Sequence, residues 1–537
     1  MAKVVNLDAM ITREDFDSEE GPAAGERGKT EASKTDLTKG ESFYITLRKP
    51  DFQRETAAWS PEAICSFLES FVEGDLIPSV ICWQSASRLT FVIDGAHRLS
   101  AVMAWLQDDY GAGEQSKAFY SNNIPPEQRK IDEDTRKLVN DRVGSYKDVR
   151  AETEHPGSDP RHTVRARSLG NAKIPLLWVP GNDSKRAERA FLTINQSAVE
   201  IDPTEFAILN SRNKPNAITA RAIVRNAGGH KYWKDFSDSG KKQVEDSGKL
   251  IYSALYHPPL QAPIRTYDLP IAGHGYGTQT LPLIFNLVNI ANKIQVVDSS
   301  KDAKKMVVEQ SAVDEPATLK CLKHTQELAD RITGDDPSSL GLHPAVYFYS
   351  VSGRHQPTSV LAVAALIMDL EKENKFIEFT KVRAGFENFL LEHKMYVNQL
   401  TSQYGSMTKG FRPVRDYYRF VLECLWQGKS NSEIEVALNE NEKYRRLVKE
   451  KPILTSQAKK FSKAVKQYLV ITDSLEHAST CELCKARFDP KSTHSDHIKD
   501  RSKGGLGSGD NGRLLHPYCD STYKRYLEGQ KSGAIAL

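Results

Sequence analysis

The feature that most constrains the fold of this chain is a pair of metal-ligand motifs near its C-terminal end. Cys481-Glu-Leu-Cys484 is followed by His516-Pro-Tyr-Cys519. Three thiols and one imidazole can complete a tetrahedral zinc site, and a structural site takes all four ligands from the protein. Because so short a segment cannot bury enough apolar surface to fold alone, the metal would supply the missing stability. The motifs therefore predict a small zinc-stabilised domain whose ligands are Cys481, Cys484, His516 and Cys519.

Polar residues between the two motifs, and directly after the second, include types that can activate water and bind a divalent cation. A histidine with a pKa near neutrality can deprotonate water. Oxygen ligands hold Mg²⁺ or Mn²⁺, which stabilises negative charge on the leaving oxygen. The residues of these types are His497, Asp496, Asn511 and Asp520. His494 is expected at the surface or behind the ligands.

Residues 478–528 resemble the HNH, or ββα-metal, nuclease family in its zinc-stabilised branch. The shared elements are the CxxC pair, Asp-His-Ile, a Gly-Gly turn, an asparagine, the second knuckle and a polar residue directly after it. Two positions depart from the family pattern: His516 replaces the usual third cysteine, and Asp520 stands where the family has Asn or His. The resemblance implies a metal-dependent endonuclease that hydrolyses phosphodiester bonds. In it we expect His497 to be the general base and expect Mg²⁺ or Mn²⁺ to be held by Asp496, Asn511 and Asp520. A zinc ribbon that binds without cutting stays open.

A basic segment precedes these motifs. Residues 443–470 contain nine Lys or Arg and one Glu. Such a charge run is usually only a solvated face, but beside a nuclease motif it is suited to phosphate contacts, which weaken steeply with salt. The DNA-binding lysines expected here lie largely off an apolar stripe and are Lys459, Lys460, Lys463 and Lys466.

A second set of motifs lies in the first part of the chain. The stretch LTFVIDGAHRLSAVMAWL, residues 89–106, predicts a strand, a tight Asp-Gly turn and a helix. Its first helical turn carries His97 and Arg98, and amide groups with an arginine at a helix start suit a phosphate. Gln53-Arg54 precedes this stretch, with Trp59 shortly after it, and an FLTIN sequence follows.

These motifs together resemble the ParB-like superfamily, particularly its GmrSD-type or DGQxR members. The matching positions are Gln53, Arg54, Trp59, Asp94, Gly95, His97, Arg98 and Asn195. Ala96 stands where the family usually has glutamine. The missing glutamine argues against nucleotide hydrolysis more than against nucleotide or DNA binding. Over residues 42–225 the resemblance implies a domain that binds a nucleoside triphosphate or another phosphate. A scaffold that reads DNA shape without a nucleotide stays open.

The resulting fold class is an α+β multidomain protein. Four segments are expected: a disordered stretch over 1–40, a ParB-like α+β domain over 41–230, a helical connecting domain over 231–470, and a ββα-metal domain over 471–537. Apolar residues at three- and four-residue spacing predict helices over 60–75, 315–333, 357–375, 377–402 and 412–427. Residues 108–170 are charged and irregular, as in an inserted surface loop or helical excursion.

The composition indicates the cellular compartment and the partners of such a chain. It is 39% hydrophobic and 27% charged, with a net charge of +3, which is typical of a globular protein. The apolar run VLAVAALIM, residues 360–368, is too short for a membrane span, and the N-terminal sequence lacks a hydrophobic signal region. We expect a cytoplasmic protein whose partner is DNA and not a membrane. Whether it forms a homo-oligomer is left open.

The two ends together resemble modification-dependent restriction proteins of prokaryotes, including GmrSD-type and SspE-type enzymes. This implies a defence endonuclease in which the N-terminal domain senses modified DNA or a nucleotide and licenses cleavage. Two alternatives stay open. One is a zinc-stabilised DNA-binding regulator that breaks no bond, and the other is a nicking endonuclease of a phage or mobile element that ignores modification.

Overall fold

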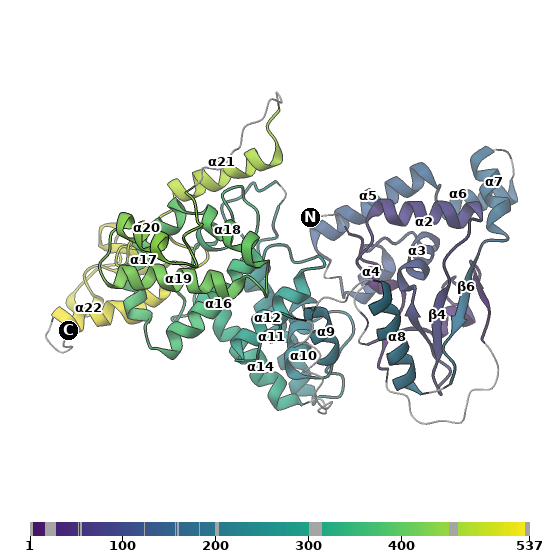
Figure 1. The fold of residues 1–537 in the computed structure, drawn as a ribbon, viewed down its shortest axis with the longest axis horizontal. Coiled ribbons are helices and arrows are strands. Elements are labelled where there is room, and N and C mark those ends of the chain that lie inside the picture. Colours follow the sequence, from purple (N-terminus) through teal and green to yellow (C-terminus); the bar gives the residue numbers. More distant parts are fainter. Residues whose placement is uncertain are drawn as a thin grey trace.

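The computed structural model confirms an α+β architecture with a helical middle part (Figure 1). The residues that it describes are 4–16, 28–51, 53, 56–122, 124–155, 157, 160–181, 183–198, 203–261, 263–299, 314–449 and 460–531. None of the helices within those ranges is both long and apolar enough to cross a membrane.

A six-stranded mixed sheet forms the centre of the N-terminal part. Its strand order is β1-β3-β5-β4-β6-β2. Strands β4 and β5 are antiparallel, whereas β5 with β3 and β4 with β6 are parallel. The strands are β1 (Arg13–Glu14), β2 (Glu31–Ser33), β3 (Leu47–Pro50), β4 (Val80–Gln84), β5 (Thr90–Asp94) and β6 (Lys173–Trp178).

Helices cover both faces of this sheet. Val92 points to the side of α2 (Pro61–Glu73) and α3 (Ala96–Gln107), where it joins a large apolar core. Its neighbours Phe91 and Ile93 point to the other side and pack near Phe191 of α8 (Ser184–Ala198). Successive residues of a strand point to opposite faces, so the apolar run of β5 serves two cores.

Local sequence signals account for the ends of α2. The Ser60 side chain accepts a hydrogen bond from the Ala63 amide at 3.2 Å, and Pro61 occupies the first helical position. Gly74 ends the helix in the left-handed region at φ 80°. These are the preferred residues for each role, and the helix predicted over 60–75 is confirmed.

Residues 108–170 form a helical excursion. Helices α5 and α7 of this excursion pack on α2. Its helices are α4 (Glu114–Phe119), α5 (Pro126–Arg142), α6 (Tyr146–Glu154) and α7 (Pro160–Leu169). The excursion therefore forms a second layer over one face of the domain.

The prediction that residues 1–40 are disordered is wrong for 4–16 and 28–40, which the structure describes. Strand β1 pairs with β3 and β2 pairs with β6, so both extend the sheet. Buried Asp8 forms ion pairs with Arg13 at 2.9 Å and with Lys49 at 2.5 Å. The charged residues of this segment thus have partners inside the domain, which its polar composition did not reveal.

The middle part is a helical core in which α16 is buried along most of its length. The helices predicted over 315–333, 357–375 and 412–427 are confirmed, while 377–402 forms two helices. The helices of this part are α9 (Pro203–Asn210), α10 (Pro215–Val224), α11 (Asp238–Tyr256), α12 (Thr280–Ala291), α14 (Glu315–Ile332), α15 (Pro344–Tyr347), α16 (Pro357–Lys372), α17 (Phe376–Glu392), α18 (Met395–Tyr404), α19 (Phe411–Trp426), α20 (Asn431–Glu440) and α21 (Lys463–Glu476).

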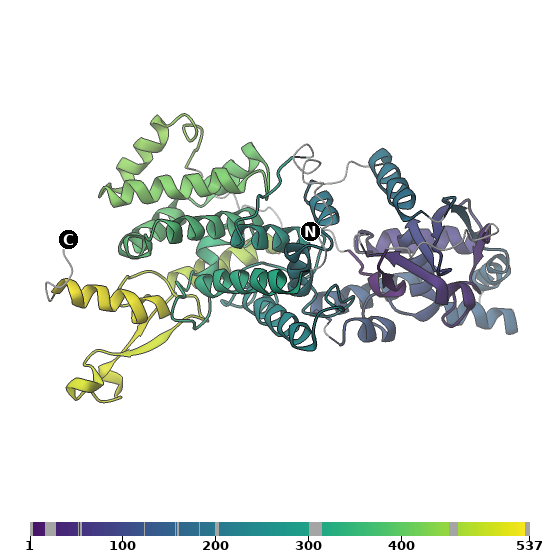
Figure 2. The same cartoon turned by 90° about the horizontal axis from the view of Figure 1, so that it is seen from below.

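The C-terminal part consists of an antiparallel hairpin of β7 (His494–His497) and β8 (Gly512–Leu515), a π-helical turn η4 (Cys519–Tyr523) and α22 (Lys524–Lys531). Figure 2 shows the hairpin and its connecting loop, in yellow, extending away from the helices. Phe488, Leu515 and Tyr518 nevertheless belong to the same apolar core as the middle helices.

The predicted boundaries at 230 and 470 do not coincide with breaks in packing. Ile218 and Ile223 of α10 are fully buried in the helical core, where α10 contacts α11, α12 and α14. The chain from α10 onward therefore packs with the helical core. At the other end, the C-terminal part packs on the helices as a continuation of one core.

Candidate metal centre and active site

Three thiols and one imidazole converge at the start of the C-terminal part. The ligand atoms of Cys481, Cys484, His516 and Cys519 all lie within 4.8 Å of one another, and all four residues are buried. His516 Nδ1 is 3.4 Å from Cys484 Sγ and 4.0 Å from Cys519 Sγ. The types of donor, their number and their burial fit a structural zinc site.

The other ring nitrogen of His516 fixes its tautomer. His516 Nε2 lies 3.1 Å from the Arg487 carbonyl oxygen, which can only accept a hydrogen bond. The proton is therefore on Nε2, and the Nδ1 lone pair faces the thiols, as in many metal sites. Burial also lowers the pKa of His516. The ring is thus held in the neutral form that binds a metal.

A buried ion pair joins this cluster to the helical core. Arg383 and Glu387 of α17 contact each other at 2.8 Å, with side-chain exposures of 1% and 0%. Glu387 accepts from the Arg487 amide at 2.9 Å. Arg383 donates to the Gly341 carbonyl at 2.9 Å and to the Arg487 carbonyl at 3.4 Å. The carbonyl that orients His516 is therefore fixed by α17.

Asp496 lies on β7, paired with Arg513 of β8. Its Oδ2 accepts from Arg513 Nε and Nη2 at 2.9 and 2.7 Å, and its Oδ1 accepts from Lys524 Nζ at 2.7 Å. Partial burial alone would raise the pKa of this carboxyl, but Lys524 and Arg513 lower it below its usual value. Asp496 is therefore a negatively charged carboxylate that two cationic side chains bind.

His497 follows Asp496 and points to the other side of the strand. It is half-buried, and no side chain or backbone group of the described residues hydrogen-bonds to its ring. Gly507 in the connecting loop faces it: a Cβ at that position would lie 3.9 Å from His497 Nε2. The imidazole therefore has no hydrogen-bond partner among the described residues, and the loop position beside it carries no side chain.

Asp520 lies in η4, directly after the metal-cluster residue Cys519. Its Oδ2 is 3.2 Å from His494 Nδ1, at the other end of the β7 strand from His497. Among the described residues, the potential metal ligands that cluster in a group of three or more are those of the cysteine–histidine cluster, whose ligand atoms lie within 4.8 Å of one another. Asp520 is not part of that group. The structure thus brings Asp496 and Asp520 to neighbouring elements without closing a ligand set around one point.

The side chain of Asn511 is bonded within the loop. Its Oδ1 accepts from the Lys499 amide at 2.7 Å, and its Nδ2 donates to the carbonyls of Lys499 and Leu506 at 3.2 and 2.7 Å. These three bonds tie the two ends of the glycine-rich loop together. Asn511 was expected to be a metal ligand, but this geometry suits a loop fastener better.

In the N-terminal domain the two predicted phosphate motifs meet. Gly95 adopts φ 90° at the start of α3, and Gln53 Nε2 donates to the Ile93 carbonyl at 3.4 Å. His97 Nε2 accepts from the Ala58 amide at 3.2 Å, and its ring stacks on Trp59 at 5.6 Å. Gln53, Ala58 and Trp59 therefore contact residues on either side of Gly95.

Other predicted residues of this motif do not all face a common space. Arg98 donates to the Ser79 carbonyl at 3.0 Å and to Asp94 at 2.8 Å, so it anchors the turn from within. Arg54 lies outside the described residues. Asn195 falls in α8, but its side chain is also outside them.

Arginines in α10 and on either side of it lie where the helical core meets this motif. Arg221 and Arg225 stack on the Tyr232 ring, with guanidinium carbons 4.3 and 5.5 Å from its centroid. Tyr232 donates to the Asp51 carbonyl at 3.0 Å, and Arg212 contacts the Asp51 carboxylate at 3.4 Å. This junction concentrates positive charge beside the segment that carries Gln53.

Of the predicted DNA-binding lysines, Lys460, Lys463 and Lys466 are exposed, and Lys459 lies outside the described residues. Lys463 and Lys466 occupy the first turn of α21, where they add to the positive end of the helix dipole instead of offsetting it. An α-helix rises 1.5 Å per residue, so Lys463 is about 20 Å from the end of α21 near the metal cluster. The lysines therefore form a separate positive surface.

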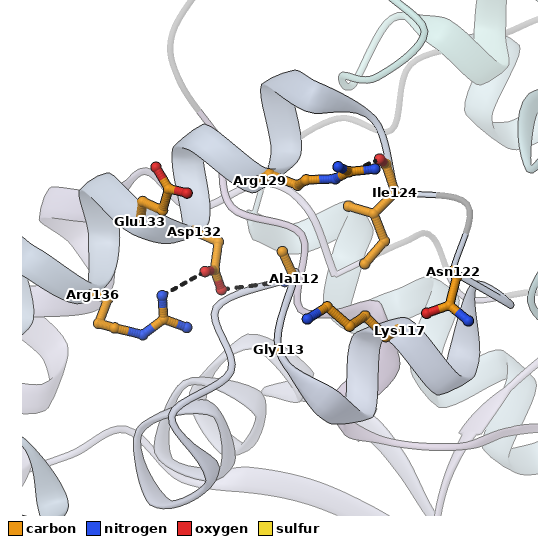
Figure 3. Close-up of a pocket in the computed structure, with 9 residues that line it drawn as sticks. All are labelled: Ala112, Gly113, Lys117, Asn122, Ile124, Arg129, Asp132, Glu133 and Arg136. Atoms are coloured by element: carbon orange, nitrogen blue, oxygen red, sulfur yellow. Dashed lines mark hydrogen bonds and ion pairs between the residues drawn. The ribbon is translucent and has the colours of Figure 1, made fainter.

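A polar cavity of about 540 Å³ opens between α4 and α5 (Figure 3). Its charged lining residues are Lys117, Arg129, Asp132, Glu133 and Arg136. Arg136 is held by Asp132 at 2.8 Å, and Arg129 donates to the Ile124 carbonyl at 3.1 Å. Because much of its charge is already paired within the chain, we assign this cavity no part in the site.

Comparison with protein families agrees with both sets of motifs. A model described as the N-terminal domain of the GmrSD restriction endonuclease matches residues 35–212, and a model described as HNH endonuclease matches residues 481–525. The chain joins a GmrSD-type N-terminal domain to an HNH endonuclease domain. No curated protein and no solved structure gives a significant match to it.

The HNH match spans the metal cluster, the hairpin and Asp520. The two matches together support a nuclease of restriction type that acts on DNA, and HNH nucleases depend on a metal ion. The Cys-His cluster points to structural zinc in this HNH domain.

Several residues around the site were not predicted from the sequence. Arg513 and Lys524 both bind Asp496, and the helical core contributes Arg383 and the chain around Gly341 to the HNH domain. Lys524 follows Asp520 by one helical turn, a spacing that places the two on one face. The contacts with Arg383 depend on long-range packing and have no local signal.

Proposed function

We propose that the HNH domain hydrolyses phosphodiester bonds of DNA with His497 as general base. The observation that carries this proposal is the arrangement of Asp496 and His497 on β7 beside Asp520, with the Cys-His cluster fixing the segment before the hairpin and the turn after it. His497 has no hydrogen-bond partner among the described residues, so its ring can accept a proton from water.

Asp496 and Asp520 are proposed as ligands of Mg²⁺ or Mn²⁺. Two carboxylates on neighbouring elements fit such a hard cation, and the cations Arg513 and Lys524 show how strongly this position attracts positive charge. When bound, the metal ion would supply positive charge where the leaving oxygen becomes anionic. We assign Asn511 the role of loop fastener, in place of the ligand role expected from its position in the motif.

Arg513 and Lys524 then have a second use. Both hold Asp496 in its ionised form, and both carry donors that can bind a phosphate once the carboxylate is engaged elsewhere. The zinc cluster keeps these groups in place, because Leu515 and Tyr518 next to its ligands pack into the helical core.

Cleavage of DNA by the purified full-length chain tests this proposal. Supercoiled plasmid and modified phage DNA would be incubated with Mg²⁺ or Mn²⁺, comparing wild type with His497→Ala and with His477→Ala, an exposed control histidine. We expect cleavage by wild type and His477→Ala, and a 10²- to 10⁴-fold loss, on the order typical of a general base, for His497→Ala. Full activity of His497→Ala would refute the assignment.

A second candidate is a zinc-stabilised DNA-binding regulator. It is favoured by the pairing of both Asp496 oxygens with Arg513 and Lys524, which leaves the carboxylate satisfied without a metal ion. No cleavage of any DNA, together with DNA binding that His497→Ala leaves unchanged, would support this function over the first.

We also propose that the GmrSD-type domain binds a phosphate-bearing ligand, either a nucleoside triphosphate or modified DNA, and licenses the HNH domain. The meeting of the Gln53 segment with the Gly95 turn supports a ligand site, and the arginines of α10 connect this site to the helical core. In this proposal the protein is a cytoplasmic defence endonuclease of a prokaryote, and it can act as a homo-oligomer.

Calorimetry with GTP, ATP and CTP tests the ligand site, with Arg98→Ala as the variant and Arg129→Ala as a control from the cavity of Figure 3. Loss of binding in Arg98→Ala alone is expected, because the Gly95 turn loses its anchor. Binding retained by Arg98→Ala would move the site elsewhere. Cleavage that is indifferent to both nucleotide and DNA modification would instead favour an unregulated nicking enzyme.

A further inference from the structure

The Asp520 carboxylate is held from the helical core through one intermediary, His494. His494 Nδ1 is 3.2 Å from Asp520 Oδ2, and His494 Nε2 is 3.2 Å from the Asp335 carbonyl oxygen. Asp335 belongs to residues 333–342, which connect α14 to α15 and which we call the 333–342 segment. One imidazole thus bridges a candidate ligand and a main-chain group of another part of the fold.

The 333–342 segment contacts both chain segments that carry this pair. On the side of His494, the Gly334 amide donates to Ser492 Oγ at 2.8 Å. On the side of Asp520, the Ser339 carbonyl accepts from the Tyr518 amide at 2.9 Å. The Pro337 carbonyl accepts from the hydroxyl of Ser521, which follows Asp520, at 2.5 Å.

The segment is itself rigidly held. Arg383 donates to the Gly341 carbonyl at 2.9 Å, and the Leu340 amide donates to the Arg331 carbonyl at 2.9 Å. Gly341 has φ 55°, and a Cβ there would lie 2.9 Å from His516 Cδ2. The Asp335 carbonyl is therefore part of a fixed surface that also touches the zinc cluster.

Asp520 needs such support because of where it lies. It is in a π-helical turn of five residues, and its side chain is 31% exposed. A partly exposed carboxylate near the start of a short turn can adopt several rotamers, whereas a ligand must be held within about 0.5 Å of its productive position. Among the described residues, His494 is the side chain that bonds to this carboxylate.

We propose that His494 is a positioning residue for the HNH reaction. Both partner atoms are acceptors, so the ring donates from both nitrogens. Nε2–H bonds to the Asp335 carbonyl, and Nδ1–H holds the Asp520 carboxylate in the orientation that binds a divalent cation. The helical core thereby completes the metal site of the HNH domain. This inference rests on the proposed role of Asp520, and it assigns the 333–342 segment a part in that site.

The test uses the zinc-loaded full-length chain and Mn²⁺ as the probe. Asparagine places an amide nitrogen near the position of histidine Nδ1, and glutamine places one near Nε2. His494→Asn therefore keeps the contact to Asp520 and loses the anchor, while His494→Gln keeps the anchor and loses the contact. Ser495→Ala, on the exposed face of the strand, and Asp335→Ala, which retains the carbonyl, are controls.

Mn²⁺ affinity measured by electron paramagnetic resonance should fall about 10- to 100-fold in His494→Ala and His494→Gln, the usual effect of removing a group that orients a ligand. His494→Asn should fall between these variants and wild type, and both controls should match wild type. In cleavage assays the Mn²⁺ concentration for half-maximal rate should rise in the same order. The KM for DNA and the zinc content should stay unchanged.

Wild-type Mn²⁺ affinity in His494→Ala, or equal affinities in the Asn and Gln variants, would overturn the inference. The role of His497 is judged separately. If His497→Ala is inactive while His494→Ala binds Mn²⁺ normally, the positioning role falls and the nuclease stands. If His497→Ala cleaves normally, the proposed function falls, whatever the His494 variants show.

Discussion

Replacing Arg383 with methionine should loosen the attachment of the HNH domain to the helical core. The guanidinium is fully buried, and it bonds to Glu387 at 2.8 Å as well as to backbone carbonyls that include those of Gly341 and Arg487. Burial alone would lower the pKa of Arg383, but the Glu387 carboxylate outweighs this effect and raises it. Arg383 and Glu387 therefore form a pair of opposite charges inside the protein.

The magnitude follows from what the substitution leaves behind. Removing one member of a buried ion pair costs about 3–5 kcal/mol, because the other charge stays buried without its partner. This cost corresponds to roughly two to three and a half orders of magnitude in the unfolding equilibrium constant. Glu387 would keep only the Tyr347 hydroxyl at 3.1 Å and the Arg487 amide at 2.9 Å.

Urea titration measures the effect, with zinc release followed by a chromogenic chelator and helix content followed by circular dichroism. Arg383→Met should release zinc at lower urea than wild type. The double variant Arg383→Met/Glu387→Gln should be more stable than the single one, because no unpaired charge remains buried. Arg419→Met, which breaks partly exposed ion pairs with Glu373 and Glu423, should cost only about 1 kcal/mol.

Two results would refute this reasoning. In one, Arg383→Met shifts the zinc-release midpoint no further than Arg419→Met does. In the other, the double variant is less stable than Arg383→Met, which would show that Glu387 does not depend on the arginine for its burial.

Three further predictions concern the zinc site, the basic helix and one carboxyl group. Cys484→Ser should lose zinc by metal analysis and make the chain after α21 sensitive to trypsin, while the helical core stays resistant; full resistance would contradict a structural metal. Lys463→Ala/Lys466→Ala should reduce the slope of log affinity for DNA against log salt by about 2, since each phosphate contact contributes about 0.9; an unchanged slope would remove these lysines from the interface. Burial, with the nearby Asp336 carboxylate, raises the pKa of Asp330 to about 6. The folded state therefore holds a proton that the unfolded state loses above pH 3.8, so stability falls as pH rises from about 4 to 6. Asp330→Asn should raise the urea midpoint at pH 7.5 and change it little at pH 4.5; equal shifts at both values would contradict the raised pKa.

The parts of this structure that the sequence predicts are those with a local cause. The spacing of Cys481 and Cys484 fixes a tight turn, in which Lys485 adopts φ 59° and the Cys481 amide bonds to the Ala486 carbonyl at 2.9 Å. The Ser-Pro start and the glycine end of α2 similarly fix that helix. In both cases the residues that decide the conformation lie within one or two turns of each other.

Other features depend on partners that are distant in the sequence. The prediction for residues 1–40 failed because β1 and β2 become strands only by pairing with β3 and β6, which no local pattern reveals. The contact of His494 with the Asp335 carbonyl spans 159 positions and involves main chain on one side. The hydrogen bonds of Asn511 to Lys499 and Leu506 also join residues that no local pattern pairs, because an asparagine in a glycine-rich loop is equally compatible with a metal ligand and with a residue that closes the loop.

Anomalous X-ray diffraction from crystals grown with Mn²⁺ tests the central claim most directly, namely that a zinc-held scaffold presents a divalent cation at the hairpin that carries His497. We predict a zinc peak among Cys481, Cys484, His516 and Cys519, and a manganese peak bound by Asp496 and Asp520. A zinc peak alone, with Asp496 still bonded to Arg513 and Lys524 at saturating Mn²⁺, would contradict the catalytic account.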